Sequence, residues 1–421
     1  MVQLQKIASE EKGAIVSGPF GSNISAKYFV DEGIPVIRGN NLTKGVQKFI
    51  DDGFVYLTET KAAEFRNCIA IKDDIVFTAA GSIGQVGIIP ENTKFEKYVI
   101  SNKQLRVLID KKKADPMFVY YWLSCPRMTG YLEGMNNGGA VPLLNLGIIR
   151  RIPVPLPPLD TQSSISAVVS NFNDLIDTNR RRIQLLEEAA RLLFREWFVY
   201  FRFPSFAKAS EDKPGHEKAC PVESINSTGV KIVNGMPEGW RKRRLVEVAD
   251  ITMGQSPKSE YYNDNGEGLP FHQGVTGFGN RYPTNQTYCT QKNRMAQSGD
   301  ILFSVRAPVG RINISTEKII IGRGISAIRS KENHQSYLFY ELKNHFFKED
   351  MIGGGAIFAA ITKKDLETVV TIVPDEKAID KFENITNPID RQIFILSNQN
   401  QKLAQARDLL LPRLMSGAIE V

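Results

Sequence analysis

The sequence predicts an α+β protein with two homologous mixed α/β domains, separated by a long antiparallel two-helix coiled coil and related by pseudo-twofold symmetry. Three observations predict this fold class. Segments of the first half of the chain reappear in the same order in the second half, which is typical of an internal repeat. Each half contains short apolar runs bounded by glycine, as β-strands have. Each half is also followed by a long stretch with heptad spacing.

The internal duplication rests on pairs of matching segments that keep the same order along the chain. The two clearest pairs are GIPVIRG at 33–39 with GLPFHQG at 268–274, and DIVFT at 74–78 with DILFS at 300–304. Weaker pairs are 118–121 with 338–340, 138–141 with 354–357, and 152–157 with 369–374. A single match would carry no information, but several colinear matches indicate two copies of one domain.

Each copy is expected to combine strands with one small helix. The apolar runs 75–77 and 301–303 each follow an aspartate inside a glycine-bounded segment, and they predict strands. Aromatic and apolar residues at helical spacing predict helices at 118–123 and 337–347. A helix of that length would pack on the strands of its own copy.

A long helix is expected after each domain, and Asp160 or Thr161 can cap the first one. Both helices place their seam residues alternately four and three positions apart. The seam of the first helix consists of Ile165, Val169, Phe172, Ile176, Asn179, Ile183, Leu186, Ala190, Leu193 and Trp197. The seam of the second consists of Phe382, Thr386, Ile389, Ile393, Leu396, Asn400, Leu403, Arg407, Leu410 and Leu414.

The length of these helices favours pairing over burial inside one domain. At 1.5 Å per residue each helix would be about 58 Å long, too long to be hidden in a domain of about 150 residues. We therefore predict that the two helices pack on each other in antiparallel fashion. Two interpretations of Asn179 and Asn400 stay open: they fix the register of the pair, or the seam is locally hydrated. The predicted segments are a first domain at 1–158, a first helix at 159–201, a connector at 202–236, a second domain at 237–375 and a second helix at 376–421.

The composition is that of a folded protein without a membrane span. No apolar run approaches the roughly 18 residues of a membrane helix, and the N-terminus lacks the apolar core of a signal peptide. The four cysteines are dispersed, so we expect buried thiols in a reducing cytoplasm. A formal net charge of +7 permits nucleic-acid binding but does not establish it.

The sequence contains no recognisable catalytic or metal-binding motif. The four histidines have no ligand spacing with one another or with the cysteines. The glycine-rich stretch 81–87 lacks the order and the GK[ST] ending of a phosphate-binding loop. PDEK at 374–377 has the letters of a nuclease motif, but its adjacent acids at a helix start favour capping. NPID at 387–390 lacks the second proline and the aromatic residue of an adenine methyltransferase motif. We therefore expect no catalytic residue and no metal ligand.

Several motifs resemble those of the specificity subunits of Type I restriction-modification enzymes, and the resemblance covers essentially the whole chain. MPEGW at 236–240, followed by Leu245 and GQSP at 254–257, looks like the opening of a target-recognition domain. GDILF at 299–303 with Gly310 looks like the signature in the middle of that domain. The ends of the two helices resemble family motifs at 193–198 with 201–204 and at 411–417. The first domain departs from the pattern because it lacks the PEGW opening, so its start is less well defined.

The resemblance implies a DNA-reading subunit without catalytic activity. Each target-recognition domain would read one half of a split double-stranded DNA sequence, and the helices would set the unread spacer. The helices would also dock two modification subunits, which methylate adenine, and restriction subunits would join this core. No cofactor is expected in this chain; S-adenosylmethionine, ATP and Mg are expected in the partner subunits. The complex would work in the cytoplasm of a bacterium or an archaeon.

Base-specific contacts need Arg, Lys, Asn, Gln or His side chains in loops, with further basic groups on phosphates. Half-sites read from one face of the duplex would lie about 34 Å, or a multiple of that, apart. The candidates in the first domain are Lys27, Arg38, Asn40, Asn41, Lys103, Gln104 and Arg106. Those in the second domain are Lys258, His272, Gln273, Arg306, Arg311 and Arg323. For each one alone, a solvated surface charge is an equally good interpretation.

Two other functions remain open at this point. The chain could be a fused methyltransferase-nuclease of related architecture, although the motifs of both enzymes are missing. It could also be a scaffold that uses the coiled coil for assembly alone. Methyl transfer by the purified chain would indicate the first, and unchanged DNA binding after substitution of Arg38 and Arg306 would indicate the second.

Overall fold

The computed structural model describes residues 1–46, 49–135, 143–202, 232–233, 236–346 and 360–420. The chain forms two compact units: unit 1 consists of Met1–Arg182 with Leu396–Val421, and unit 2 of Ile183–Ile395. The boundary cuts through both long helices, α6 (Leu159–Phe194) and α10 (Glu376–Ser416). Each unit therefore holds one sheet domain with part of each helix, whereas the sequence suggested that the helices form segments of their own. The connector expected at 202–236 lies mostly outside the described residues.

The strands of unit 1 form two main sheets and a short two-stranded one. They are β1 (Val2–Gln3), β2 (Ile15–Ser17), β3 (Phe29–Val30), β4 (Ile34–Ile37), β5 (Val55–Leu57), β6 (Ile69–Ala70), β7 (Ile75–Thr78), β8 (Val86–Ile88), β9 (Tyr98–Ile100), β10 (Gln104–Val107) and β11 (Pro153–Val154). The four-stranded sheet has the order β2-β10-β7-β8, the five-stranded sheet has the order β3-β5-β4-β9-β6, and β1 pairs with β11. Within the five-stranded sheet β4 and β9 are parallel.

Unit 2 repeats the topology of all three sheets and adds one further strand pair, β12 with β13. Its strands are β12 (Ile232–Val233), β13 (Met236–Pro237), β14 (Arg241–Arg244), β15 (Ala249–Met253), β16 (Tyr262–Asn263), β17 (Leu269–His272), β18 (Tyr288–Cys289), β19 (Met295–Ala296), β20 (Ile301–Ser304), β21 (Ile312–Ile314), β22 (Ile319–Ile321), β23 (Ile325–Ser330) and β24 (Val370–Val373). Here the orders are β15-β23-β20-β21 and β16-β18-β17-β22-β19, with β14 paired to β24. The parallel pair recurs as β17 with β22. Two copies of one domain predict such a repeat.

Short helices pack on the sheets of each unit. In unit 1 they are α1 (Leu4–Ile7), α2 (Glu59–Ala63), α3 (Pro116–Ser124), α4 (Pro126–Gly134) and α5 (Leu146–Arg150), and in unit 2 α7 (Leu245–Val248), α8 (Gln335–Phe346) and α9 (Lys363–Glu367). The helices expected at 118–123 and 337–347 are confirmed as α3 and α8. Asp115 caps α3, because its carboxylate accepts a hydrogen bond from the Met117 amide at 2.8 Å. The matching segments 138–141 and 354–357 lie outside the described residues.

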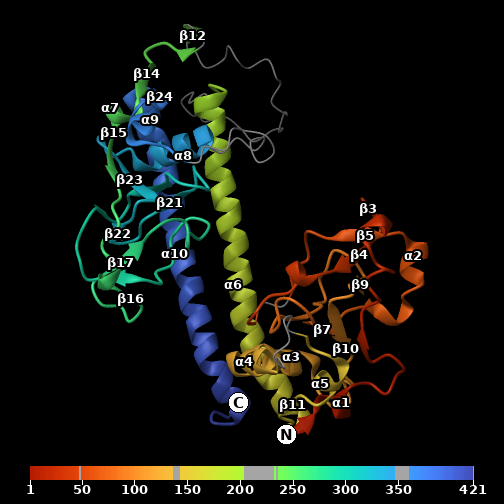
Figure 1. The fold of residues 1–421 in the computed structure, drawn as a ribbon. Coiled ribbons are helices and arrows are strands. Elements are labelled where there is room, and N and C mark those ends of the chain that lie inside the picture. Colours follow the sequence, from red (N-terminus) through yellow and green to blue (C-terminus); the bar gives the residue numbers. More distant parts are fainter. Residues whose placement is uncertain (47–48, 136–142, 203–231, 234–235, 347–359, 421) are drawn as a thin grey trace, which may run out of the picture. The chain divides into compact units, whose positions relative to one another are not determined.

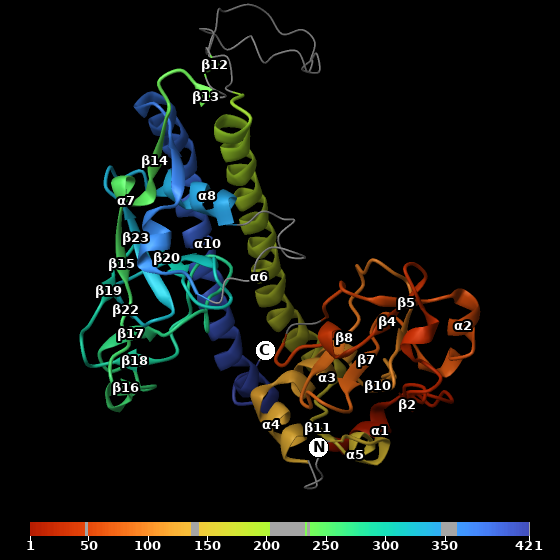
Figure 2. The same cartoon turned by 45° about the horizontal axis from the view of Figure 1, so that its top comes forward.

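In the four-stranded sheet of each unit, the inner strands β7 and β20 are buried on both faces. In β7, Ile75 and Phe77 join the core that includes α3 and α6, while Val76 joins the core of the five-stranded sheet. In Figures 1 and 2, β7 and β10 accordingly lie between α3 and β4. In β20, Phe303 packs with α8 and α10, and Leu302 packs on the other side with β22. Burial on both faces explains why these strands are continuous apolar runs.

The ends of the long helices show how the sequence places them. The Gln162 amide donates to the carbonyl of Pro158 at 3.0 Å, so α6 begins before the caps expected at Asp160 or Thr161. The Asp375 carboxylate accepts from the Ala378 amide at 3.0 Å at the start of α10, and this confirms the capping interpretation of PDEK. Beyond Phe194, α6 continues as one π-helical turn, Arg195–Val199. In the part of the chain that the structure describes, no helix combines the length and the apolar character needed to span a bilayer.

Candidate nucleic-acid interface

In unit 1, loops that adjoin the ends of β2, β4, β7 and β10 meet through backbone hydrogen bonds. Ser101 N donates to Ile37 O at 3.0 Å, Ala79 N donates to Lys103 O at 2.7 Å, and Gly18 N donates to Gln104 O at 3.0 Å. We call residues 18–23, 38–41, 79–85 and 101–104 loop cluster 1. These backbone bonds hold the loops on the sheets, and some of the side chains that the loops carry are exposed.

Unit 2 has the same arrangement at the equivalent strand ends. Gly322 N donates to His272 O at 2.8 Å, Val305 N donates to Gly324 O at 2.9 Å, and Gly254 N donates to Ile325 O at 2.9 Å. We call residues 254–258, 273–274, 305–311 and 322–324 loop cluster 2. The backbone framework is therefore repeated, although the side chains that it carries differ.

Each cluster contains at least one glycine that is required by close backbone approach. A Cβ atom on Gly18 would lie 1.9 Å from the carbonyl oxygen of Ser101, and one on Gly254 would lie 2.2 Å from that of Gly322. Distances this short exclude any side chain unless the backbone moves. This contact explains the glycine of the GQSP motif at 254–257.

The candidates in unit 1 fall into exposed and buried groups. Asn40 and Lys103 are exposed on loop cluster 1, and Arg38 is half-buried there. Lys27 is also exposed, but it lies outside the cluster, with its ammonium 4.7 Å from the ring centroid of Tyr28. Loop cluster 1 therefore contains three candidates whose side chains are exposed or half-buried: Asn40, Lys103 and Arg38.

Asn41, Gln104 and Arg106 are held inside unit 1. Asn41 is 0% exposed, and its amide donates to the carbonyls of Ile50 and Asp52 at 3.1 and 2.8 Å. Gln104 is 1% exposed, and its amide lies against Ser101. The guanidinium of Arg106 donates to the Gly13 carbonyl at 2.6 Å and pairs with Asp74 at 3.4 Å. These side chains bind the protein's own backbone and acids, so the structure corrects their expected direct role at a DNA base.

The candidates in unit 2 are mostly exposed. Gln273, Arg306, Arg311, Arg323 and Lys258 are all exposed, and all belong to loop cluster 2. Ser256 links two parts of the cluster: its hydroxyl donates to Gln273 Oε1 at 2.6 Å and accepts from the Arg323 amide at 3.2 Å.

His272 is the exception in unit 2. It is 3% exposed at the end of β17, and its Nε2 lies 3.0 Å from Oδ1 of Asn285. Burial lowers the pKa of the imidazole, so the ring is neutral near pH 7. The structure therefore corrects the expectation that His272 faces DNA.

Two exposed side chains of loop cluster 1 were not predicted from the sequence. Phe20 is 85% exposed between Gly18 and Gly21, and Asn102 is exposed next to Lys103. A Cβ atom on Gly21 would lie 2.9 Å from Nδ2 of Asn102, so the two loops are in contact. An aromatic residue inside a GPFG turn was the available signal, because such turns are exposed and an apolar tip there is unusual.

The seam positions of the long helices are buried or half-buried throughout, within whichever unit they belong to. In unit 1, Nδ2 of Asn179 donates to Oδ1 of Asn400 at 3.0 Å and to Oε1 of Gln399 at 3.2 Å. Arg407 donates to Oδ1 of Asn173 at 2.6 Å in the same unit. In unit 2, the rings of Phe194 and Phe382 are 5.9 Å apart. In each unit, then, side chains of α6 contact side chains of α10.

Among the described residues, no group of three or more His, Cys, Asp or Glu side chains is placed to hold a metal ion. Cys68, Cys125 and Cys289 are buried free thiols, and Cys220 lies outside the described residues.

A family model described as "Type I restriction modification DNA specificity domain" matches the chain twice, at 23–188 and 237–405. The two matches cover most of the sequence. The chain belongs to the type I restriction-modification specificity family. The proteins of this family are non-catalytic specificity subunits, in agreement with the expectation from the sequence.

Relatives of this specificity chain extend over nearly its full length. It is 31% identical to a putative type I restriction enzyme MjaX specificity subunit of Methanocaldococcus jannaschii, over 95% of this chain and 91% of that protein. It is 24% identical to the MjaIX specificity subunit of the same organism, over 97% and 92%. The crystal structure of a type I restriction-modification S subunit from M. genitalium covers 98% of the chain and 95% of that protein, with 14% identity and a TM-score of 0.57. This last similarity concerns the fold alone.

Proposed function

We propose that this chain is the DNA-reading specificity subunit of a type I restriction-modification complex, and that each loop cluster binds one half of a bipartite double-stranded DNA sequence. One observation carries the proposal: the same framework of loops recurs at the same strand ends in both units, and each copy presents exposed polar and basic side chains. Two similar recognition surfaces on one chain are what a split target requires.

The side chains of the two clusters suit different bases. Loop cluster 2 presents Arg306, Arg311 and Arg323, and arginine pairs best with the O6 and N7 atoms of guanine. Loop cluster 1 presents Asn40, Asn102 and Lys103, and asparagine pairs with the N6 and N7 atoms of adenine. We therefore expect two half-sites of unlike sequence. Lys27 and Lys258 are exposed at positions suited to phosphate contacts.

We further propose that α6 and α10 form an antiparallel coiled coil that fixes the unread spacer, with pseudo-twofold symmetry between the domains. The buried seam and the bond between Asn179 and Asn400 support this pairing. A helix of 36 residues is about 54 Å long, which exceeds the roughly 34 Å of one DNA turn. The rod is therefore long enough to serve as a ruler.

The outward faces of the helices suit the docking of other subunits. Leu185 and Leu192 on α6 are 54% and 46% exposed, and Ile395 and Leu409 on α10 are 51% and 68% exposed. Large apolar side chains kept in water are typical of protein-protein contacts. We assign them to two modification subunits and to the restriction subunits, in which S-adenosylmethionine, ATP and Mg would be bound. Such a complex would work in the cytoplasm, where it meets DNA.

Methylome sequencing of the host tests the proposal. A split, adenine-methylated motif should be present in the wild type and absent after deletion of this gene. Purified chain should show no methyl transfer by itself, because the family's specificity subunits are non-catalytic. A motif that persists after deletion would contradict the proposal.

Substitution at the clusters tests the interface itself. In the complex with its modification subunits, Arg306→Ala should weaken binding to the cognate DNA by about 10- to 100-fold and relax the preference at one base position. Arg243→Ala is the matched control, because Arg243 is exposed on β14, outside loop cluster 2. Equal binding by both variants, and by Arg38→Ala, would indicate that the chain is an assembly scaffold.

A further inference from the structure

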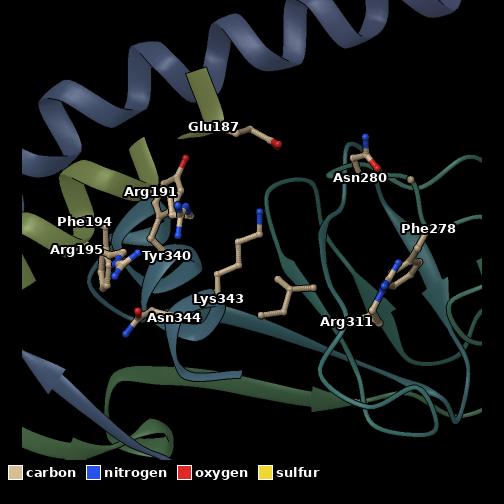
Figure 3. Close-up of a pocket in the computed structure, with 12 residues that line it drawn as sticks. Glu187, Arg191, Phe194, Arg195, Phe278, Asn280, Arg311, Tyr340, Lys343 and Asn344 are labelled. Atoms are coloured by element: carbon tan, nitrogen blue, oxygen red, sulfur yellow. The ribbon is translucent and has the colours of Figure 1, made fainter. Parts of the chain in front are cut away.

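Unit 2 contains a cavity of about 370 Å³ that shares only Arg311 with the proposed DNA contacts. It is lined by α6 from Glu187 to Arg195, by the last turns of α8, and by the loop from Phe278 to Asn280 (Figure 3). Arg311 closes one side. A volume of this size falls in the range of pockets that hold small organic ligands, roughly 300 to 1,000 Å³.

The lining of this cavity combines apolar rings with an excess of positive charge. Phe194, Phe278 and Tyr340 contribute ring surface. The basic side chains are Arg191, Arg195, Arg311 and Lys343, against one acidic side chain of the lining, Glu187; Arg191 is also paired with Glu188 at 2.7 Å. Figure 3 shows the ammonium of Lys343 pointing into the middle of the cavity.

Two polar groups in the cavity lack a hydrogen-bond partner among the described residues. The half-buried ammonium of Lys343 makes no hydrogen bond or ion pair there, and lies 5.3 Å from the ring centroid of Phe339. Burial lowers the pKa of this lysine. Oε1 of Glu187 is buried without a donor, and its nearest cation, Nη1 of Arg281, is 3.7 Å away. A ligand that satisfies both groups must bring an anionic acceptor and a hydrogen-bond donor.

A second cavity, in unit 1, shows that the fold alone does not produce these features. It measures about 270 Å³ and is lined by the end of α3 together with parts of α6 and α10. Its cations are paired: Arg180 with Asp177 at 3.0 Å, Arg407 with Asp408 at 2.9 Å, and Lys44 with Glu133 at 2.5 Å. The unit 1 cavity therefore has no uncompensated charge of the kind that Lys343 supplies.

We propose that the cavity of unit 2 binds a free nucleotide. The phosphate would accept hydrogen bonds from Lys343 and from the arginines of the rim, the base would pack on the aromatic side chains, and a ribose hydroxyl or base amine would donate to Glu187. A DNA backbone phosphate has the same chemistry, but a duplex reaches exposed cations such as Arg306 more readily than a half-buried lysine inside a cavity. Free nucleotide is therefore the favoured source.

Calorimetry with the full-length chain tests this site, with AMP, adenosine and inorganic phosphate as probes. AMP should bind once per chain with a Kd below about 1 mM, and adenosine and phosphate should each bind at least about tenfold more weakly. Lys343→Met should weaken AMP binding by about tenfold or more, since it removes a charge-assisted hydrogen bond, and Lys343→Arg should restore much of it. Arg180→Met, in the cavity of unit 1, is the matched control and should leave AMP binding unchanged.

Two further measurements separate this site from the DNA interface and from misfolding. DNA binding by Lys343→Met should equal that of the wild type; loss of DNA binding without any AMP binding would assign the cavity to the DNA interface and overturn the proposal. In the wild type, AMP should protect Lys343 from amine-reactive labelling, which mass spectrometry detects. This measurement needs no variant, so a misfolded variant cannot affect it. Absence of AMP binding at about 10 mM, or equal labelling of Lys343 with and without AMP, would also overturn it.

Discussion

At the scale of single residues, Glu341 is a buried carboxyl that forms no ion pair with any described residue. It is 7% exposed in α8, and its Oε1 accepts one hydrogen bond, from the Ile372 amide at 3.1 Å. Desolvation raises its pKa from 4.5 to about 7. At pH 8 the folded state must therefore keep a charge in a site that stabilises it poorly.

Glu341→Gln should stabilise unit 2 at high pH and not at low pH. The pKa of Glu341 is higher in the folded protein than in the unfolded chain. The stability that the protonated carboxyl contributes is therefore fully present below pH 4.5 and is lost as the pH rises through about 7. At pH 8 the substitution should raise the free energy of unfolding by about 3 kcal/mol, from a shift of roughly 2.5 pKa units. Thermal melts of both proteins at pH 4.5 and pH 8 check this. An equal difference at the two pH values would contradict the role of ionisation.

The sequence predicted which loops carry polar side chains, but it did not predict the direction in which each side chain points. Arg306, Arg323 and Gln273 were identified from their place in glycine-bounded loops, and their side chains do face outward. Asn41 and His272 were chosen by the same rule, but their side chains bind a carbonyl and a neighbouring amide inside the unit. Residue type and loop position do not reveal which way a polar side chain turns, because a buried backbone group competes with DNA for the same donor.

At the scale of elements, the periodic spacing of apolar residues predicted the helices and strands better than capping side chains predicted the helix ends. The strands β7 and β20 and the helices α3 and α8 were found because apolar runs and helical spacing report burial directly. The predicted start of the first helix, at 159, agrees with α6, but its cap was placed too late, at Asp160 or Thr161, since Pro158 provides the first carbonyl of the helix. The two- and three-residue strands of the five-stranded sheets were not predicted, because such short runs carry no recognisable period.

The polar pair in the seam should couple α6 to α10. Asn179→Ala should lower the free energy of unfolding by about 1 kcal/mol, because the amide of Asn400 loses its donor. Replacing both asparagines by leucine should restore or exceed the wild-type stability, at the expense of a defined register. Urea unfolding of Asn179→Leu, Asn400→Leu and the double leucine variant gives the coupling energy. Asn171→Ala, at an exposed position of α6, is the control and should change little.

A second prediction at this scale concerns the contacts that bind a loop of unit 2 to both long helices. Arg281 is 3% exposed; it pairs with Asp390 of α10 at 2.5 Å and with Glu187 of α6 at 3.7 Å. Arg281→Met should destabilise unit 2 by about 3 kcal/mol, because it leaves the half-buried Asp390 and Glu187 without this cation. The control Arg294→Met changes a less buried arginine. Equal melting temperatures for the two variants would show that the pairs add no net stability.

At the scale of the whole molecule, the duplicated sheet order and the duplicated helix could both be predicted from the sequence. The matching segments 33–39 and 268–274 contain the equivalent strands β4 and β17, each of which pairs in parallel with a neighbour in its own sheet. The repeat could be recognised in the sequence at such strands, because burial restricts them to similar residues. The division into units that share both helices was not predicted, because heptad spacing does not show which domain a given turn contacts.

If the helices act as a ruler, lengthening both should lengthen the unread spacer. Insertion of one heptad after Arg182 and one before Leu396 adds about 10.5 Å to each helix, close to three base pairs of DNA. The seam phase is kept, so the methylated motif should retain both half-sites with a spacer about three base pairs longer. Insertion into α6 alone should abolish methylation, since it breaks the pairing. Methylome sequencing distinguishes these outcomes, and a changed half-site would refute the ruler.

The glycine contacts beneath the loops bear on how such a protein acquires a new target. Gly18 and Gly254 approach carbonyl oxygens too closely for any side chain, whereas Lys103 and Arg323, near these contacts, face solvent. On the proposed function, folding depends on the first set of positions and target choice on the second. A single replacement at an outward position would then alter the bound sequence while the protein still folds, and it would expose the host's own chromosome to a site that it has not yet marked.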